Sequence, residues 1–193
     1  MFENIIAKEG KQKILYAFFA FIFFVIVEFS FLALISFAFF LWFIFIYRYK
    51  NVNINSLDKN CIYSPISGKI VAIDGKKLYI KVSLFDSHIL RALDNSKADI
   101  LIKRGVNLLL SSIKSKKLNE NALIEFDNCS MLLVSSLFND SINIEKKDIY
   151  KKGEKIGTFL DGEVIVEISE NYKINVEIGQ KVDSGVTILA LNK

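Results

Sequence analysis

The chain has 193 residues, a formal net charge of +4 and a single histidine, and 52% of its residues are hydrophobic. This length allows one domain or two. The positive charge is modest, and we find no RNP motif, helix-turn-helix or basic stripe with interleaved aromatic residues, so we expect no nucleic-acid partner. Cys61 and Cys129 are far apart and belong to no CxxC motif. This spacing predicts reduced, buried cysteines and no metal site.

Residues 14–47 are almost wholly apolar, with Glu28 as the only charge. A run of this length and uniformity predicts a membrane-embedded segment, and it is too long for a cleavable signal peptide. One straight helix over the run would be about 50 Å long, against about 30 Å of hydrocarbon, so we expect a break near Glu28 and a helical hairpin. Because each arm is short for a full crossing, a re-entrant hairpin in one leaflet is an equal alternative.

Basic residues flank the apolar run at both ends: Lys8, Lys11, Lys13, Arg48 and Lys50. The positive-inside rule then keeps both ends in the cytoplasm, which predicts a protein of the cytoplasmic (inner) membrane whose soluble part faces the cytoplasm. Glu28 is either a functional intramembrane carboxylate or a turn residue at the far headgroup layer, and we favour the turn. We therefore expect a membrane-anchoring hairpin over residues 1–50, a polar linker over 51–60 and a β domain over 61–193.

Beyond residue 60 the pattern is typical of β structure. Residues 69–73 and 77–82 are rich in β-branched side chains, and Asp74-Gly75 between them predicts a hairpin with a type I′ turn. Further strands are expected at residues 122–126, 130–137, 142–144, 164–168, 173–178 and 187–191. Residues 115–121 read as a polar connection. Many short strands at regular spacing, with almost no helical pattern, predict a mainly β fold.

Two similar turns stand near the C-terminus, GEKI at residues 153–156 and GQKV at residues 179–182. Glycine permits a tight turn before each strand, and lysine keeps the loop solvated. With the segment SPISGKI at residues 64–70, these turns resemble those of barrel-sandwich hybrid folds such as biotinyl-carrier and lipoyl domains. We expect a barrel-sandwich-hybrid-like β domain. A carrier function is a weaker alternative, because the hairpin at Asp161-Gly162 offers no lysine for modification.

The order of the motifs resembles the short, membrane-anchored bacterial type of phosphatidylserine decarboxylase and its archaeal-lipid relatives. AKEG at residues 7–10 leads into the apolar hairpin, and SPISGKI follows at residues 64–70. Next come SLFDSHILRA at residues 83–92, NENALIE at residues 119–125, and the paired Gly-Lys turns. The resemblance runs almost from end to end, and the segment around His88 and the C-terminal tail contribute most to it.

The resemblance implies a role in phospholipid metabolism. In that family a proenzyme cuts itself at a Gly-Ser bond, and the serine becomes a pyruvoyl group. This group forms a Schiff base with the amine of phosphatidylserine and acts as the electron sink while the carboxylate leaves, which yields phosphatidylethanolamine. The expected partners are a membrane phospholipid with an anionic headgroup and either a second copy of the chain or a partner lipid enzyme.

The tail departs from the family at the self-processing position. Aligned backwards from Gln180, it places Asp161-Gly162 where Gly-Ser should stand, and no Ser, Thr or Cys lies between Leu160 and Ile168. Glycine has no hydroxyl group to attack or to eliminate, so we expect no pyruvoyl cofactor and a catalytically degenerate protein. The alternative is an active phospholipid decarboxylase with atypical processing or another cofactor. The nearby Thr158 would yield a 2-oxobutyryl group, and its position is wrong by four residues.

Two further departures are Ser67, where the family has an aspartate thought to assist self-cleavage, and Leu93, where it usually has proline. The candidate catalytic residues that remain are His88 and Asp86. On an alternating strand the two would share one face, and an imidazole with its usual pKa of about 6.5 suits proton transfer. Alternatively, His88 is structural and bonds to a backbone carbonyl or to Asp86, while Asp86 and Arg91 form an ordinary surface pair.

Overall fold

The computed structural model describes residues 6–48, 51–54, 57–58 and 60–193. The chain divides into two compact units, with the boundary between Asn51 and Val52. Lys50, one of the predicted flanking charges, lies outside the described residues.

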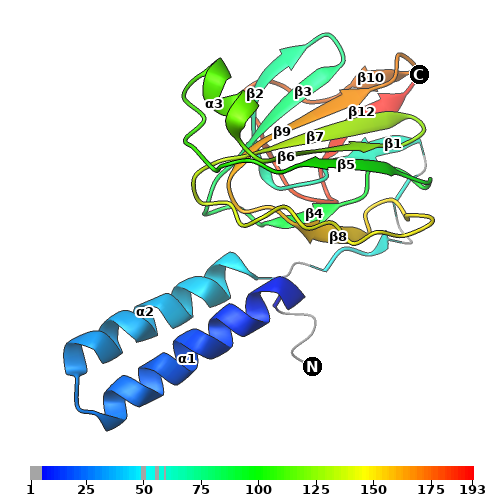
Figure 1. Cartoon of the computed structure of the whole chain (residues 1–193). Helices are drawn as coiled ribbons and strands as arrows, with labels where there is room; N and C mark the ends of the chain where they lie inside the picture. The colour runs from blue at the N-terminus through cyan, green and yellow to red at the C-terminus, as the bar shows by residue number, and fades with distance from the viewer. Residues whose placement is uncertain (1–5, 49–50, 55–56, 59) are drawn as a thin grey trace. The chain divides into compact units, whose positions relative to one another are not determined.

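The first unit is a helical hairpin (Figure 1). After the short helix η2 (Lys8–Gly10), helices α1 (Lys11–Ile26) and α2 (Ser30–Ile46) lie side by side. The predicted break near Glu28 is confirmed, and this residue has a φ of 63°, the only positive φ of a non-glycine residue among those described. In the described part of the chain, no helix combines the length and the apolar character that a membrane crossing requires.

Small residues bring the two helices together. Ala17 of α1 and Ala33 and Ser36 of α2 are buried, as is expected where helix backbones approach closely. Phenylalanine rings fill the rest of the contact, with centroids 5.3 Å apart for Phe21 and Phe37. Most other large apolar side chains of the hairpin point outward and are exposed. The hairpin therefore has no polar face of the kind that a helix on the surface of a soluble protein shows.

Tyr47 closes the open end of the hairpin. Ala7 N donates a hydrogen bond to Tyr47 O at 2.9 Å, and Lys13 Nζ donates to the Tyr47 hydroxyl at 2.9 Å. A Cβ atom on Gly10 would lie 2.2 Å from Tyr47 Cγ, so this contact requires glycine. The AKEG lead, noted in the sequence before the apolar run, is thus the segment on which Tyr47 packs.

The second unit is mainly β, as predicted. Its strands are β1 (Cys61–Tyr63), β2 (Gly68–Asp74), β3 (Lys77–Val82), β4 (Ile89–Arg91), β5 (Asp99–Lys103), β6 (Asn121–Glu125), β7 (Cys129–Ser135), β8 (Lys155–Thr158), β9 (Gly162–Ile168), β10 (Tyr172–Ile174), β11 (Lys181–Val182) and β12 (Ile188–Asn192). They form a seven-stranded sheet in the order β11-β2-β3-β9-β7-β6-β5, a three-stranded sheet β1-β12-β10 and the pair β4-β8. The strand pairings are antiparallel. The specific likeness to barrel-sandwich hybrids stays a prediction.

The core lies on the inner face of the large sheet. Alternate residues of its strands are fully buried, among them Leu78 and Ile80 of β3, Met131 of β7, and Val164 and Val166 of β9. This alternation is the expected pattern for a sheet with one face in the core. Cys61 and Cys129 are buried and free, as predicted, and burial raises the pKa of the Cys129 thiol to about 12.

The turns lie where the sequence predicts them, but one of them differs from the predicted turn type. Gly153 and Gly179 precede β8 and β11 with φ values of 77° and 92°, so both Gly-Lys turns are confirmed. The β2–β3 hairpin also turns as expected after Asp74. Gly75 has a φ of 55°, but Lys76 is not among the residues with positive φ. The predicted type I′ turn is therefore wrong, because one positive φ at the first central residue is the pattern of type II′.

Three local expectations are wrong. The predicted polar connection contains a short helix, α3 (Ile113–Leu118), whose start is fixed by Ser112 Oγ accepting a hydrogen bond from Ser115 N at 3.1 Å. Residues 142–144 form no strand and contribute only an isolated bridge from Ile144 to Gly157. β10 ends at Ile174, four residues before the predicted end, although Asn175 N still donates to Leu189 O of β12 at 2.8 Å.

Candidate functional site

A cleft of about 550 Å³ lies at one end of the large sheet. The ends of β3 and β9 line it, together with the loops that follow β3, precede α3 and follow β7. The predicted self-processing residues Asp161 and Gly162 are both in its wall. The charged side chains of Lys81, Lys116 and Glu163 line the same space. The fold therefore places Asp161 and Gly162 beside an open cleft whose lining is mainly apolar, with a few charged side chains.

Gly162 is held in a conformation that requires glycine. It begins β9, paired with Val82 of β3 and Ser135 of β7, and its φ is 146°. A Cβ atom here would lie 2.2 Å from Val134 O and 2.7 Å from Phe159 Cζ. The nearer contact is with a backbone atom of the neighbouring strand, so it cannot be relieved by a rotamer change. No side chain fits at position 162 without a shift of the backbone.

The loop after β7 holds the residues on the other side of this glycine. Ser136 N donates to Asp161 O at 3.0 Å, and Phe138 N donates to the Asp161 carboxylate at 3.2 Å. The Asn139 carboxamide oxygen accepts a hydrogen bond from Leu160 N at 2.7 Å. Asp161 is therefore a structural residue of the cleft wall. The sequence gives no signal for the role of Asn139, because its partner lies 21 residues away.

We expect Asn139→Ala to lower the free energy of unfolding by about 2–3 kcal/mol, because the buried Leu160 N–H loses its acceptor. The Asn139 amide group also donates to Ser135 Oγ at 2.9 Å, and that bond is lost as well. Urea denaturation measures the change. Asn171→Ala, at an exposed turn residue, is the matched control and should stay within about 0.5 kcal/mol of the parent. Equal losses for the two variants would contradict the assigned role of Asn139.

Glu163 is the first residue of β9 whose side chain reaches the cleft. Its carboxylate pairs with the ammonium group of Lys116 in α3, which also lines the cleft. The Glu163 side chain is largely buried, whereas the Lys116 side chain is partly exposed. A carboxylate that is largely buried needs a partner of opposite charge, because burial removes much of its hydration. The ion pair leaves one face of the lysine in contact with solvent and available to an anionic ligand.

His88 is buried, with 1% of its surface exposed, and lies outside the cleft wall. Its Nε2 atom is 3.1 Å from Ser83 O, and its carbonyl oxygen accepts a hydrogen bond from Phe159 N at 2.9 Å. The interpretation that the histidine bonds to a backbone carbonyl is thus confirmed. The contact with Phe159 ties His88 to the segment that leads into Gly162.

Asp86 does not share a strand face with His88. The expected strand over residues 85–89 is wrong, because β4 begins only at Ile89 and the residues before it form a turn. The Asp86 carboxylate accepts hydrogen bonds from Ser83 N at 3.0 Å and from Ser83 Oγ at 2.9 Å. These bonds close the turn locally, as is typical of aspartate in such positions. Neither Asp86 nor His88 is among the residues that line the cleft.

Arg91 and Ser67 connect distant parts of the β unit. The expectation of a surface pair between Asp86 and Arg91 is wrong, because Arg91 is 2% exposed and its guanidinium donates to Gly153 O at 2.8 Å. Ser67 is also buried, and its hydroxyl accepts a hydrogen bond from Ser184 N at 2.9 Å. Both side chains therefore tie strand ends to the Gly-rich turns of the tail.

Thr158 lies in β8, where it is paired with Ile89 of β4. Thr158 is not among the residues that line the cleft, so the structure offers no support for self-cleavage there. Within the described residues, no cluster of three or more His, Cys, Asp or Glu side chains could hold a metal ion.

The chain matches the family model described as phosphatidylserine decarboxylase over residues 39–190. A relative from Archaeoglobus fulgidus, named "Putative archaetidylserine decarboxylase proenzyme", is 30% identical over 133 residues, which cover 66% of this chain and 68% of the relative. A relative from Pelagibacter ubique, named "Phosphatidylserine decarboxylase proenzyme", is 28% identical over 155 residues, with coverages of 69% and 72%. No solved structure matches the chain.

Proposed function

Since the chain belongs to the phosphatidylserine decarboxylase family, we propose that it is a membrane-anchored, catalytically inactive member that binds a phospholipid headgroup in the cleft beside Gly162. The observation that carries the proposal is the absence of a hydroxyl or thiol side chain from the cleft-facing start of β9. Asp161, Gly162 and Glu163 occupy these positions. The residues present do not fit a pyruvoyl group, because none of them can lose a β-hydroxyl group to form one.

The geometry of β9 also supports a register for the lost Gly-Ser pair. Position 162 accepts only glycine in this backbone, which favours Gly162 as the counterpart of the family's glycine and Glu163 as that of its serine. This register is one residue later than the alignment from Gln180 suggests. In either register the nucleophile is missing. At position 163 it would be replaced by a carboxylate that pairs with Lys116.

Membrane anchoring is supported by the surface of the hairpin. Phe19, Phe23 and Phe31 are more than half exposed, and burying each such ring in hydrocarbon would contribute about 2 kcal/mol. Lys13 and Arg48 stand at the open end of the hairpin, and the other end carries no basic residue. This arrangement suits an anchor whose open end meets the anionic cytoplasmic leaflet. It supports a location at the cytoplasmic membrane, with the β unit in the cytoplasm.

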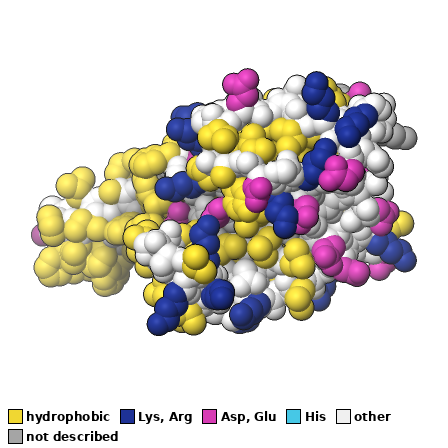
Figure 2. Space-filling view, turned by 90° about the horizontal axis from the view of Figure 1, so that it is seen from above, with side chains coloured by type: hydrophobic (Ala, Val, Ile, Leu, Met, Phe, Trp, Pro, Cys, Tyr) yellow, Lys and Arg dark blue, Asp and Glu magenta, His cyan; other side chains and the backbone are white. Residues whose placement is uncertain are grey.

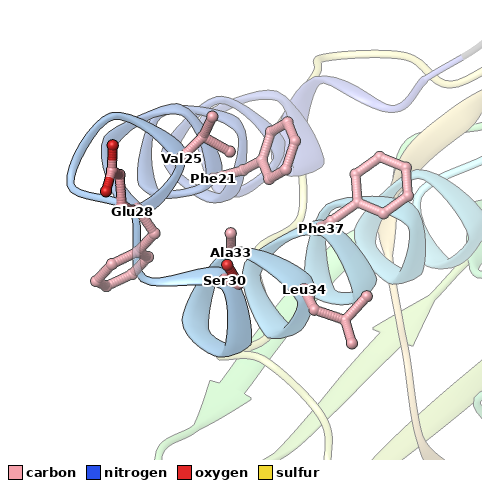
Figure 3. Close-up of a pocket in the computed structure, with 8 residues that line it drawn as sticks. Phe21, Val25, Glu28, Ser30, Ala33, Leu34 and Phe37 are labelled. Atoms are coloured by element: carbon pink, nitrogen blue, oxygen red, sulfur yellow. The ribbon is translucent and has the colours of Figure 1, made fainter.

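Glu28 stands at the closed end of the hairpin (Figure 3). An apolar opening of about 390 Å³ lies beside it, between Phe21 and Val25 of α1 and Ala33 and Phe37 of α2. The carboxylate itself is exposed, and the positive φ of Glu28 lets the chain reverse between the helices. These features support the interpretation of Glu28 as a turn residue at a headgroup layer rather than as a residue buried in hydrocarbon.

We expect the full-length protein to float with phosphatidylcholine vesicles that contain phosphatidylserine, and to release no phosphatidylethanolamine or CO₂ above a protein-free blank. The vesicles supply both the bilayer for the hairpin and the headgroup for the cleft. Lipid chromatography and flotation on a density gradient measure the two outcomes. Conversion of the phosphatidylserine would establish the alternative of an active decarboxylase with atypical processing. A protein that stays at the bottom of the gradient would contradict the membrane anchor.

A further inference from the structure

We propose that the β unit makes a second membrane contact, in which the loops around the cleft dock onto an anionic phospholipid bilayer. The inference rests on the proposed membrane association but concerns a different surface from the hairpin. Docking there would let a lipid headgroup enter the cleft without leaving the bilayer.

The first observation is a rim of exposed apolar side chains around the cleft. Phe85 is 69% exposed, Leu109 is 63% exposed and Phe138 is 59% exposed. They come from three separate loops, which follow β3, β5 and β7, and all three line the same cleft. Ile113, at the start of α3, is 77% exposed. Large apolar side chains gathered around one opening mark an interaction surface, whereas single exposed ones do not.

The second observation is that charge is segregated along the strands of the large sheet. Directly paired residues at the cleft end form the row Lys181, Lys69, Lys81, Glu163, Val134, Asn121, Lys103. The corresponding row at the other end is Asp74, Lys77, Glu167, Ser130, Glu125, Asp99. The rows are about 13 Å apart, which corresponds to four residues along most of the strands and to five along β2, where the register shifts. The row at the cleft end thus contains four lysines and one acidic residue. The row at the other end contains four acidic residues and one lysine.

Helix α3 adds further positive charge beside the rim. Lys114 and Lys117 are exposed, and neither side chain forms a hydrogen bond or an ion pair with another described residue. A lysine held at an anionic surface contributes about 1 kcal/mol of attraction. Figure 2 shows hydrophobic side chains on one face of the β unit, interspersed with Lys, Arg, Asp and Glu.

The distribution of charge identifies a bilayer as the occupant. A protein partner would need only a small patch of complementary charge. A flat anionic surface instead attracts the whole basic end of the sheet and repels the acidic end. The middle row of the outer sheet face contains Tyr79, Ile165 and Leu132, which are half-buried, and it ends in β5 at Leu101, a single side chain that is 69% exposed. The exposed apolar side chains that lie together around the cleft are those on the loops, at the basic end.

Fluorescent labels on the full-length protein test the inference. Leu109→Cys and Phe138→Cys would carry an environment-sensitive probe, and Glu125→Cys, at the acidic end, is the control; the two native cysteines are buried. In phosphatidylcholine vesicles with phosphatidylglycerol, brominated lipids should quench the two rim labels and leave the control unquenched. In vesicles of phosphatidylcholine alone, quenching at the rim should fall. Rim labels that stay in water on vesicle-bound protein would overturn the inference.

Charge reversal separates docking from simple proximity to the membrane. Lys114→Glu with Lys117→Glu should weaken rim docking by at least about 30-fold, since the loss of each lysine removes about 1 kcal/mol of attraction and each glutamate adds repulsion. Lys173→Glu, at an exposed lysine of β10, should leave it unchanged. All variants should still float with the vesicles, because the hairpin is intact. Loss of flotation by the parent protein would instead contradict the proposed anchor, so the two failures are distinguishable. Equal quenching in both reversal variants would also overturn the inference.

Discussion

Gly162→Ala is expected to lower the free energy of unfolding of the β unit by about 3 kcal/mol or more, because a side chain is disfavoured at its φ of 146° and its Cβ atom would meet Val134 O. Urea denaturation followed by circular dichroism measures the loss. The effect should appear as a lower denaturation midpoint with little change in slope.

Gly75→Ala is the matched control for this substitution. Gly75 also has a positive φ, 55°, but no atom lies within 4 Å of the Cβ position. Its cost should be about 1 kcal/mol, the usual penalty for a left-handed conformation. The difference between the variants isolates the collision with β7. Equal losses would show that position 162 tolerates a side chain, and Gly162 would no longer be assigned as the glycine of the lost pair.

The same steric argument decides how a hydroxyl group should be restored. Gly162→Ser carries the cost of Gly162→Ala, so failure to cleave would say nothing about the register. Glu163→Ser places the hydroxyl directly after a glycine that the backbone already accommodates. It also removes the partner of Lys116, which leaves that lysine free to bind a ligand.

The sequence predicts those parts of the fold that depend on neighbouring residues. The turn after Asp74, the two Gly-Lys turns and the break at Glu28 all stand where glycine, charge or periodicity places them. The sequence wrongly predicts a strand over residues 85–89, because apolar and polar residues alternate there without forming one. Asp86 instead bonds to Ser83 three residues earlier and closes a turn. The Ser-x-x-Asp spacing is the signal that would have found it.

The candidate site depends on contacts between distant residues, which the sequence alone does not show. Lys116 and Glu163 are 47 residues apart, and Arg91 and Gly153 are 62 apart. Because the sequence does not show that Gly153 O is the partner of Arg91, we expected Arg91 at the surface, whereas both residues are buried. In contrast, the absence of a hydroxyl or thiol nucleophile depends only on which residues follow Leu160, so it can be read from the sequence alone.

The measurement that tests the account most directly is the intact mass of the purified full-length protein. Self-cleavage would split the chain near residue 162 into two parts, and the C-terminal part would begin with a keto acid. We expect instead a single uncut chain close to the calculated 22.0 kDa, because neither Gly162 nor Glu163 can attack the carbonyl group before it. Two chains, the shorter of them blocked at its N-terminus by a keto acid, would contradict the assignment of an inactive family member.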